Sequence, residues 1–106
     1  MKLGVVISVN DAETCWNAFR FANFALARKD DVRVFLMGKG VEYQSVGAAA
    51  FDTAGQAEAF VGAGGKLFAC GTCMKSRNQA DTPACPMSTM KDMYEIVAES
   101  DRVVTF

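Results

Sequence analysis

The 106-residue sequence contains no histidine, and it has no run of apolar residues long enough to cross a membrane. The missing histidine excludes Cys–His and Ser–His catalytic pairs and every metal site that uses an imidazole ligand. The net charge is −1 and no stretch is strongly basic, so we expect neither a nucleic acid nor a membrane surface as the main partner. We expect residues 1–106 to form one domain, because the chain is too short for two.

Four cysteines are present, and hydrophobic residues make up 51% of the chain, which suits a packed core that needs no disulfide. The apolar run at residues 3–9 is short, and a polar stretch follows where a signal peptide would have small residues before its cleavage site. We therefore interpret this run as a buried strand and expect a cytoplasmic protein. In a reducing cytoplasm, cysteines are more often catalytic or metal-binding than paired in disulfides.

Apolar runs and helical patterns alternate along the chain. Short apolar runs predict strands at residues 3–9, 32–37, 67–69 and 102–106, and a fifth strand has two candidate positions, residues 47–51 and 79–83. Helices are expected at residues 11–29, 41–46, 52–61, 72–78 and 89–100. This order predicts a three-layer α/β fold of flavodoxin-like type, a mostly parallel sheet flanked by helices. The expected sheet core is Leu3, Val5, Ile7, Val34, Leu36, Leu67 and Val104.

The first expected helix carries two separate signals. Asn10 with Glu13 predicts its N-cap, and Cys15 belongs to its buried stripe as a small hydrophobic residue. Phe21 and Phe24 do not fit that stripe, and two neighbouring aromatic side chains on a polar face indicate a subunit contact. On the last helix, one face collects Met90, Met93, Tyr94 and Val97.

Residues 66–87 contain three of the four cysteines. The expected strand at 67–69 leads directly into Cys70 and Cys73, and Cys85 follows a polar loop. A strand-to-helix turn in an open α/β sheet lies at the carboxyl edge, where binding sites collect. The free amides and the dipole of the helix favour a thiolate there. The stretch therefore indicates a reactive cysteine.

Three interpretations of these cysteines remain open. In the first, Cys70 is a nucleophile whose thiolate is stabilised by the helix amides and by Lys75 and Arg77. Cys73 would then resolve a disulfide or accept sulfur, and we expect it to be less exposed than Cys70. In the second, Cys70, Cys73 and Cys85 ligate a metal; no fourth ligand is evident, so we expect no metal and no cofactor. In the third, the cysteines are buried and structural, which fits Cys85 best.

The Cys-Gly-Thr-Cys stretch also matches thioredoxin locally, but it comes too late in the chain for a thioredoxin-like domain. Three other stretches are more informative: Val-Phe-Leu-Met-Gly at 34–38, Leu-Phe-Ala-Cys-Gly-Thr-Cys-Met-Lys-Ser-Arg at 67–77 and Cys-Pro-Met-Ser-Thr-Met at 85–90. With the order of the elements, they resemble the DsrE/DsrF-like sulfur-relay family of small α/β proteins over nearly the full chain.

This resemblance implies a DsrE-like fold and sulfur held as a persulfide on the strand-end cysteine, which Cys70 matches. It further implies a homo-oligomer, a trimer or hexamer, that works with sulfur donor and acceptor proteins. Cys73 and Cys85 depart from the single-cysteine pattern of that family. The leading hypothesis is a persulfide carrier or sulfurtransferase-like protein that uses Cys70. The alternatives are a dithiol redox protein using Cys70 and Cys73, or a protein that binds metal through cysteine.

Overall fold

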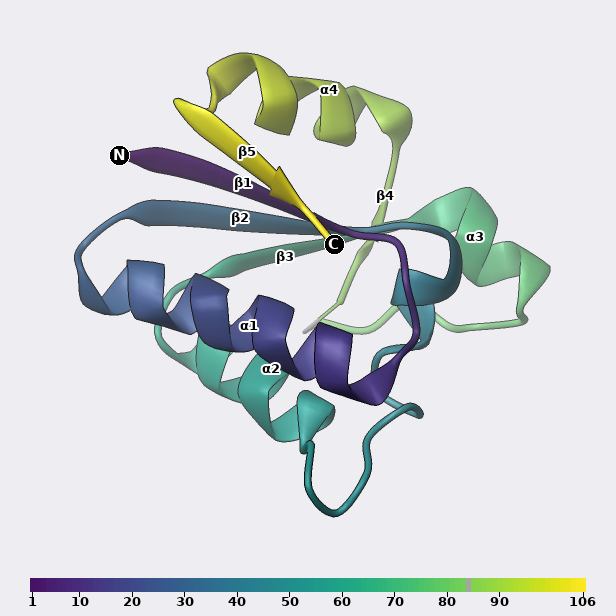
Figure 1. Ribbon diagram of the computed structural model, residues 1–106. Helices are drawn as coiled ribbons and strands as arrows, with labels where there is room; N and C mark the ends of the chain where they lie inside the picture. The colour runs from purple at the N-terminus through teal and green to yellow at the C-terminus, as the bar shows by residue number, and fades with distance from the viewer. Residues whose placement is uncertain (84) are drawn as a thin grey trace.

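A parallel sheet of five strands forms the centre of the structure, a computed structural model that describes residues 1–83 and 85–106 (Figure 1). The strand order is β4-β3-β2-β1-β5, and every neighbouring pair runs parallel. Helices α1 and α2 cover one face of the sheet and α4 covers the other. The predicted three-layer α/β class is confirmed. The elements are β1 (Lys2–Ile7), α1 (Ala12–Ala27), β2 (Asp31–Leu36), η1 (Gly38–Glu42), α2 (Thr53–Gly62), β3 (Lys66–Cys70), α3 (Gly71–Ser76), β4 (Met87–Ser88), α4 (Met90–Glu99) and β5 (Arg102–Thr105).

Successive strand residues serve opposite faces, as the pleat requires. On β3, Leu67 and Ala69 join the core under α1 and α2, whereas Phe68 and Cys70 lie on the α4 side. Six of the seven residues expected in the sheet core are buried, and Val104 is partly buried against the same core. The last residue of β3 is therefore directed toward α4.

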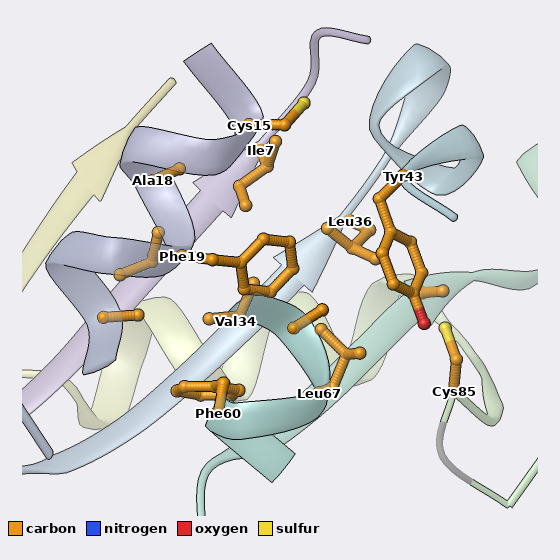
Figure 2. Packing of buried hydrophobic residues seen from close by; sticks show 14 of the residues in the cluster. Ile7, Cys15, Ala18, Phe19, Val34, Leu36, Tyr43, Phe60, Leu67 and Cys85 are labelled. Atoms are coloured by element: carbon orange, nitrogen blue, oxygen red, sulfur yellow. The ribbon is translucent and has the colours of Figure 1, made fainter. Parts of the chain in front are cut away.

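Aromatic rings fill the layer between the sheet and the two helices below it (Figure 2). The ring of Phe19 lies 5.8 Å from that of Tyr43 and 6.2 Å from that of Phe60, measured between centroids. Cys15 is fully buried on α1 and donates its thiol hydrogen to the carbonyl of Val9 at 3.1 Å. Its predicted place in the buried stripe is confirmed.

Two local predictions near the first two strands are wrong. Asp11 rather than Asn10 caps α1, because its carboxylate accepts the backbone N–H of Thr14 at 2.9 Å. Residues 41–46 do not form the expected helix; a 3₁₀ helix, η1, begins earlier, at Gly38. Gly38 has a positive φ of 54°, and Gly40 packs so tightly on β1 that an added Cβ would clash with the carbonyl oxygen of Ile7.

The fifth strand is β4, at neither of the two candidate positions. Residues 48 and 51 form only an isolated antiparallel bridge, and residues 79–83 form no strand. Ala84 lies outside the described residues. A strand of two residues is too short to show an alternating pattern, which explains why the sequence did not predict it.

Helix α4 begins as expected, with Thr89 as N-cap and a capping box to Asp92. Its Met90, Tyr94 and Val97 are exposed, so the face they share points away from the sheet. Ile96 is the α4 residue that faces the sheet. It packs over Gly4, and a Cβ added to Gly4 would lie 2.9 Å from Cγ2 of Ile96. Within residues 1–83 and 85–106, no helix combines the length and the apolar character that a membrane span needs.

The contact between η1 and β1 can be tested with a pair of glycine substitutions. Gly40→Ala should lower the free energy of unfolding by about 1–3 kcal/mol, because the new methyl group pushes η1 away from Ile7. Gly62→Ala at the end of α2 meets nothing within 4 Å, so stability should be unchanged or slightly higher. Urea unfolding measures both variants, and equal losses would contradict the packing described.

Candidate functional site

Two of the three predicted site cysteines lie together at the carboxyl edge of the sheet. Cys70 ends β3 and is the N-cap of α3, and Cys73 lies in the first turn of that helix. Both line a pocket of about 510 Å³. Its walls come from the residue after β2, the start of α3, β4 and the start of α4. The other lining residues are Met37, Gly71, Thr72, Lys75, Met87, Ser88, Thr89 and Met90.

The exposure of the two thiols is the reverse of the prediction. Cys70 is only 7% exposed, because the strand directs it toward α4, where it packs with Phe35 and Ile96. Cys73 is half-buried and is the more accessible of the two. The first turn of α3 therefore presents its thiol more openly than the strand end does.

The sulfur of Cys73 accepts a hydrogen bond from the backbone N–H of Gly38, with an N···S distance of 3.2 Å. This contact fixes the Cys73 sulfur against the turn that follows β2. Cys70 makes no side-chain capping hydrogen bond to α3 in the described structure, and α3 has only six residues. The sequence predicts that amides of the following helix contact the Cys70 sulfur. In the structure it is the Cys73 sulfur that accepts an amide N–H, and the donor lies in the turn after β2.

Arg77 holds α3 against η1. Its Nε lies 2.7 Å from Oε2 of Glu42, and its NH1 group donates to the carbonyl oxygen of Cys73 at 3.2 Å. The hydrogen bond from Arg77, with a second from Asn10, keeps the pKa of Glu42 below its usual value. Arg77 therefore positions the Gly38 turn and the Cys73 backbone, and it does not line the pocket as the predicted thiolate partner would. Lys75 does line it.

Cys85 lies apart from this pair. It is 5% exposed and packs in the core on the α1 and α2 side, where the hydroxyl of Tyr43 points toward its sulfur (Figure 2). Burial raises the pKa of the Cys85 thiol and of the Tyr43 hydroxyl. In the described part of the chain, no three Cys, His, Asp or Glu side chains are grouped so that they could hold a metal ion. The three-cysteine metal arrangement is therefore not formed.

The sequence analysis missed the part that methionines play in the pocket. Met37 directly follows β2, and the register of β4 pairs Ser88 with Cys70 and so places Met87 beside the pocket. Gly71 makes this approach possible, because a Cβ there would lie 3.2 Å from the Ser88 carbonyl oxygen and 3.6 Å from the Met87 Cβ. The Cys-Pro-Met-Ser-Thr-Met stretch was the available signal, but only the strand pairing shows its meaning.

Comparison with known proteins gives one family and several relatives. The whole chain, residues 1–106, matches the sequence model of the DsrE/DsrF-like family. The uncharacterized protein MK0008 of Methanopyrus kandleri is 30% identical over 100 aligned positions, and the alignment covers 89% of this chain and 83% of that protein. The uncharacterized protein MJ0989 of Methanocaldococcus jannaschii is 31% identical over 114 aligned positions that cover both chains fully. The crystal structure of the ychN protein from E. coli superimposes with a TM-score of 0.85 at 20% identity, covering 100% of both chains, which shows the shared fold.

The four thiols should differ in their rate of alkylation. We expect Cys73 to react first with iodoacetamide, because it is the most accessible thiol and its sulfur accepts an N–H. Cys70 should follow, and Cys15 should react only on unfolding, since burial raises its pKa to about 11. Cys85 should be slow for the same reason. Peptide mass spectrometry over time gives the order, and labelling of Cys15 or Cys85 as fast as Cys73 would contradict it.

Proposed function

Because the chain belongs to the DsrE/DsrF-like family, we propose that it is a sulfur-relay protein that holds sulfane sulfur as a persulfide in the Cys70–Cys73 pocket. Membership of the family supports a role related to sulfur relay in general. We propose, beyond this general role, that the sulfur is held as a persulfide and that one of these cysteines carries it. The observation that supports it most is that two free thiols, one with an N–H on its sulfur, line the same pocket.

The two thiols suit different tasks. Cys70 occupies the strand end where the family resemblance puts the carrier, and its low exposure would protect a persulfide from solvent and from stray thiols. Cys73 is more exposed, and its sulfur accepts a hydrogen bond from the backbone N–H of Gly38. This position suits a thiolate that exchanges sulfur with a persulfide on Cys70. We therefore propose Cys70 as the carrier and Cys73 as the second thiol, whereas Cys85 contributes only to the core.

Loading and discharge are both nucleophilic substitutions at sulfur. The Cys70 thiolate attacks the outer sulfur of the donor's persulfide, the donor's S–S bond breaks, and the donor leaves as a thiolate. In discharge, an acceptor nucleophile attacks the outer sulfur on Cys70, and the Cys70 thiolate is restored. Neither step needs an outside oxidant or reductant, and Lys75 at the pocket offsets the negative charge. Sulfur donor and acceptor proteins in the cytoplasm are the partners that this role requires.

Single Cys→Ser variants test the carrier. After incubation with a small persulfide donor, intact-mass spectrometry should show one added sulfur on the parent, and loading should rise with pH because the thiolate is the reacting form. Cys70→Ser should lose the added sulfur, and Cys85→Ser, the matched control outside the pocket, should keep it. Cys73→Ser should also load but should pass its sulfur on more slowly. Full loading of Cys70→Ser would remove this residue as carrier.

A dithiol redox role is the second candidate, since Cys70 and Cys73 are both free and line one pocket. The two roles differ in a direct assay. A relay protein accepts sulfane sulfur and gives it to cyanide, forming thiocyanate. A dithiol oxidoreductase reduces a small disulfide catalytically. Disulfide turnover without sulfur loading would replace the proposed function by this second one.

The first helix is proposed as a contact between copies of the chain. Phe24 is 65% exposed and Phe21 is 40% exposed, and the ring of Phe106 lies 6.4 Å from that of Phe21 between centroids. We expect a trimer or hexamer by sedimentation at micromolar concentration, and Phe24→Ser should shift it toward smaller species. Tyr94→Ser on α4 removes an aromatic ring that is equally open, 73% exposed, and should leave the assembly intact. A monomeric parent would contradict the proposal.

A further inference from the structure

Five sulfur-containing residues line the same pocket: Met37, Cys70, Cys73, Met87 and Met90. They are half of the ten lining residues, although the chain has only six methionines and four cysteines in all. None of the ten is an aspartate, a glutamate or a histidine. Packing does not explain all of the methionines, because Met90 is 55% exposed at the rim.

This donor set selects one class of metal ion. Thiolates and thioethers are soft ligands that favour Cu(I), whereas magnesium, calcium and manganese require oxygen donors. Structural zinc takes four ligands from cysteine, histidine or carboxylate, and this pocket offers two. We propose that the pocket binds one Cu(I) ion through the thiolates of Cys70 and Cys73 and the thioether of Met37.

Met37 is the methionine best placed to complete such a site. Like Cys73, it packs against the cluster that contains Cys70 on the α4 side of the sheet, and the next residue, Gly38, donates its N–H to the Cys73 sulfur. Met87 packs on the α1 and α2 side, and Met90 opens the α4 side of the pocket. These two methionines shield the ion from water and from competing ligands. Together the three explain a concentration of thioethers that sulfur transfer does not require.

The binding step is an exchange without electron transfer. Cu(I) displaces one proton from each of two thiols and forms two Cu–S bonds, which leaves the complex with a net charge of −1. The neutral thioether adds without changing that charge, and the Lys75 ammonium at the pocket offsets it. Copper must be supplied as Cu(I), because Cu(II) would oxidise the dithiol. This proposal does not depend on sulfur transfer, although bound copper would occupy the thiols that a persulfide needs.

Competition with a chromophoric Cu(I) chelator tests the site, using the reduced full-length chain without oxygen. We expect one Cu(I) per chain, and both Cys70→Ser and Cys73→Ser should abolish stoichiometric binding. Met37→Leu keeps the size and shape of the side chain and should weaken binding on the order of tenfold, the scale that loss of a supporting contact has at metal sites. Met93→Leu is the matched control, because Met93 packs against the same Cys70 cluster but does not line the pocket. Cys85→Ser should bind like the parent.

Two results would overturn the proposal. In the first, Met37→Leu and Met93→Leu have the same affinity, and the methionines are then packing residues around an ordinary dithiol. In the second, Zn(II) displaces Cu(I) from the folded protein, and the pocket is then not selective for a soft ion. X-ray absorption provides a readout that does not depend on variants that fold poorly: sulfur-only coordination with three scatterers is expected, and nitrogen or oxygen ligands would contradict it.

Discussion

The parallel register of β2, β3 and β4 is the constraint on which the candidate site depends. Leu36 of β2 is paired with Ala69 of β3, so the turn at Gly38 leaves the sheet beside the start of α3. Ser88 of β4 is paired with Cys70 and completes the edge. Because side chains alternate along a strand, a slip of one residue would move Cys70 into the core under α1 and α2. The pocket forms because β2, β3 and β4 end at the same edge of the sheet, in register with one another.

The four cysteines show how position changes the chemistry of one residue type. Cys15 and Cys85 lie in the core between the sheet and α1 and α2, where burial disfavours the thiolate. Cys70 and Cys73 lie at the sheet edge. The sulfur of Cys73 accepts a hydrogen bond from the backbone N–H of Gly38, which is 35 residues away in the sequence. The ion pair of Glu42 with Arg77 fixes that turn against α3. The geometry of the candidate site therefore depends on the arrangement of the backbone as much as on the thiols.

The sequence predicted those features that depend on local pattern. Apolar runs gave the α/β class, and the run that leads into Cys70 placed the site at the carboxyl edge of the sheet. The remaining features are non-local. The exposure of Cys70 depends on the face that α4 covers, the place of Cys85 depends on its packing against Tyr43, and the Gly38 amide reaches Cys73 only through strand pairing. The two-residue β4 leaves no periodic signal, so nothing in the sequence assigns Met87 to a strand.

The central claim is that the Cys70–Cys73 pocket, and neither of the buried thiols, holds transferred sulfur. A crystal structure determined at high resolution after treatment with a persulfide donor tests this directly. The account predicts electron density for one additional sulfur atom bonded to the Cys70 sulfur, inside the pocket bounded by Met37, Met87 and Met90. Additional sulfur density on Cys85 or Cys15, with none in this pocket, would contradict it.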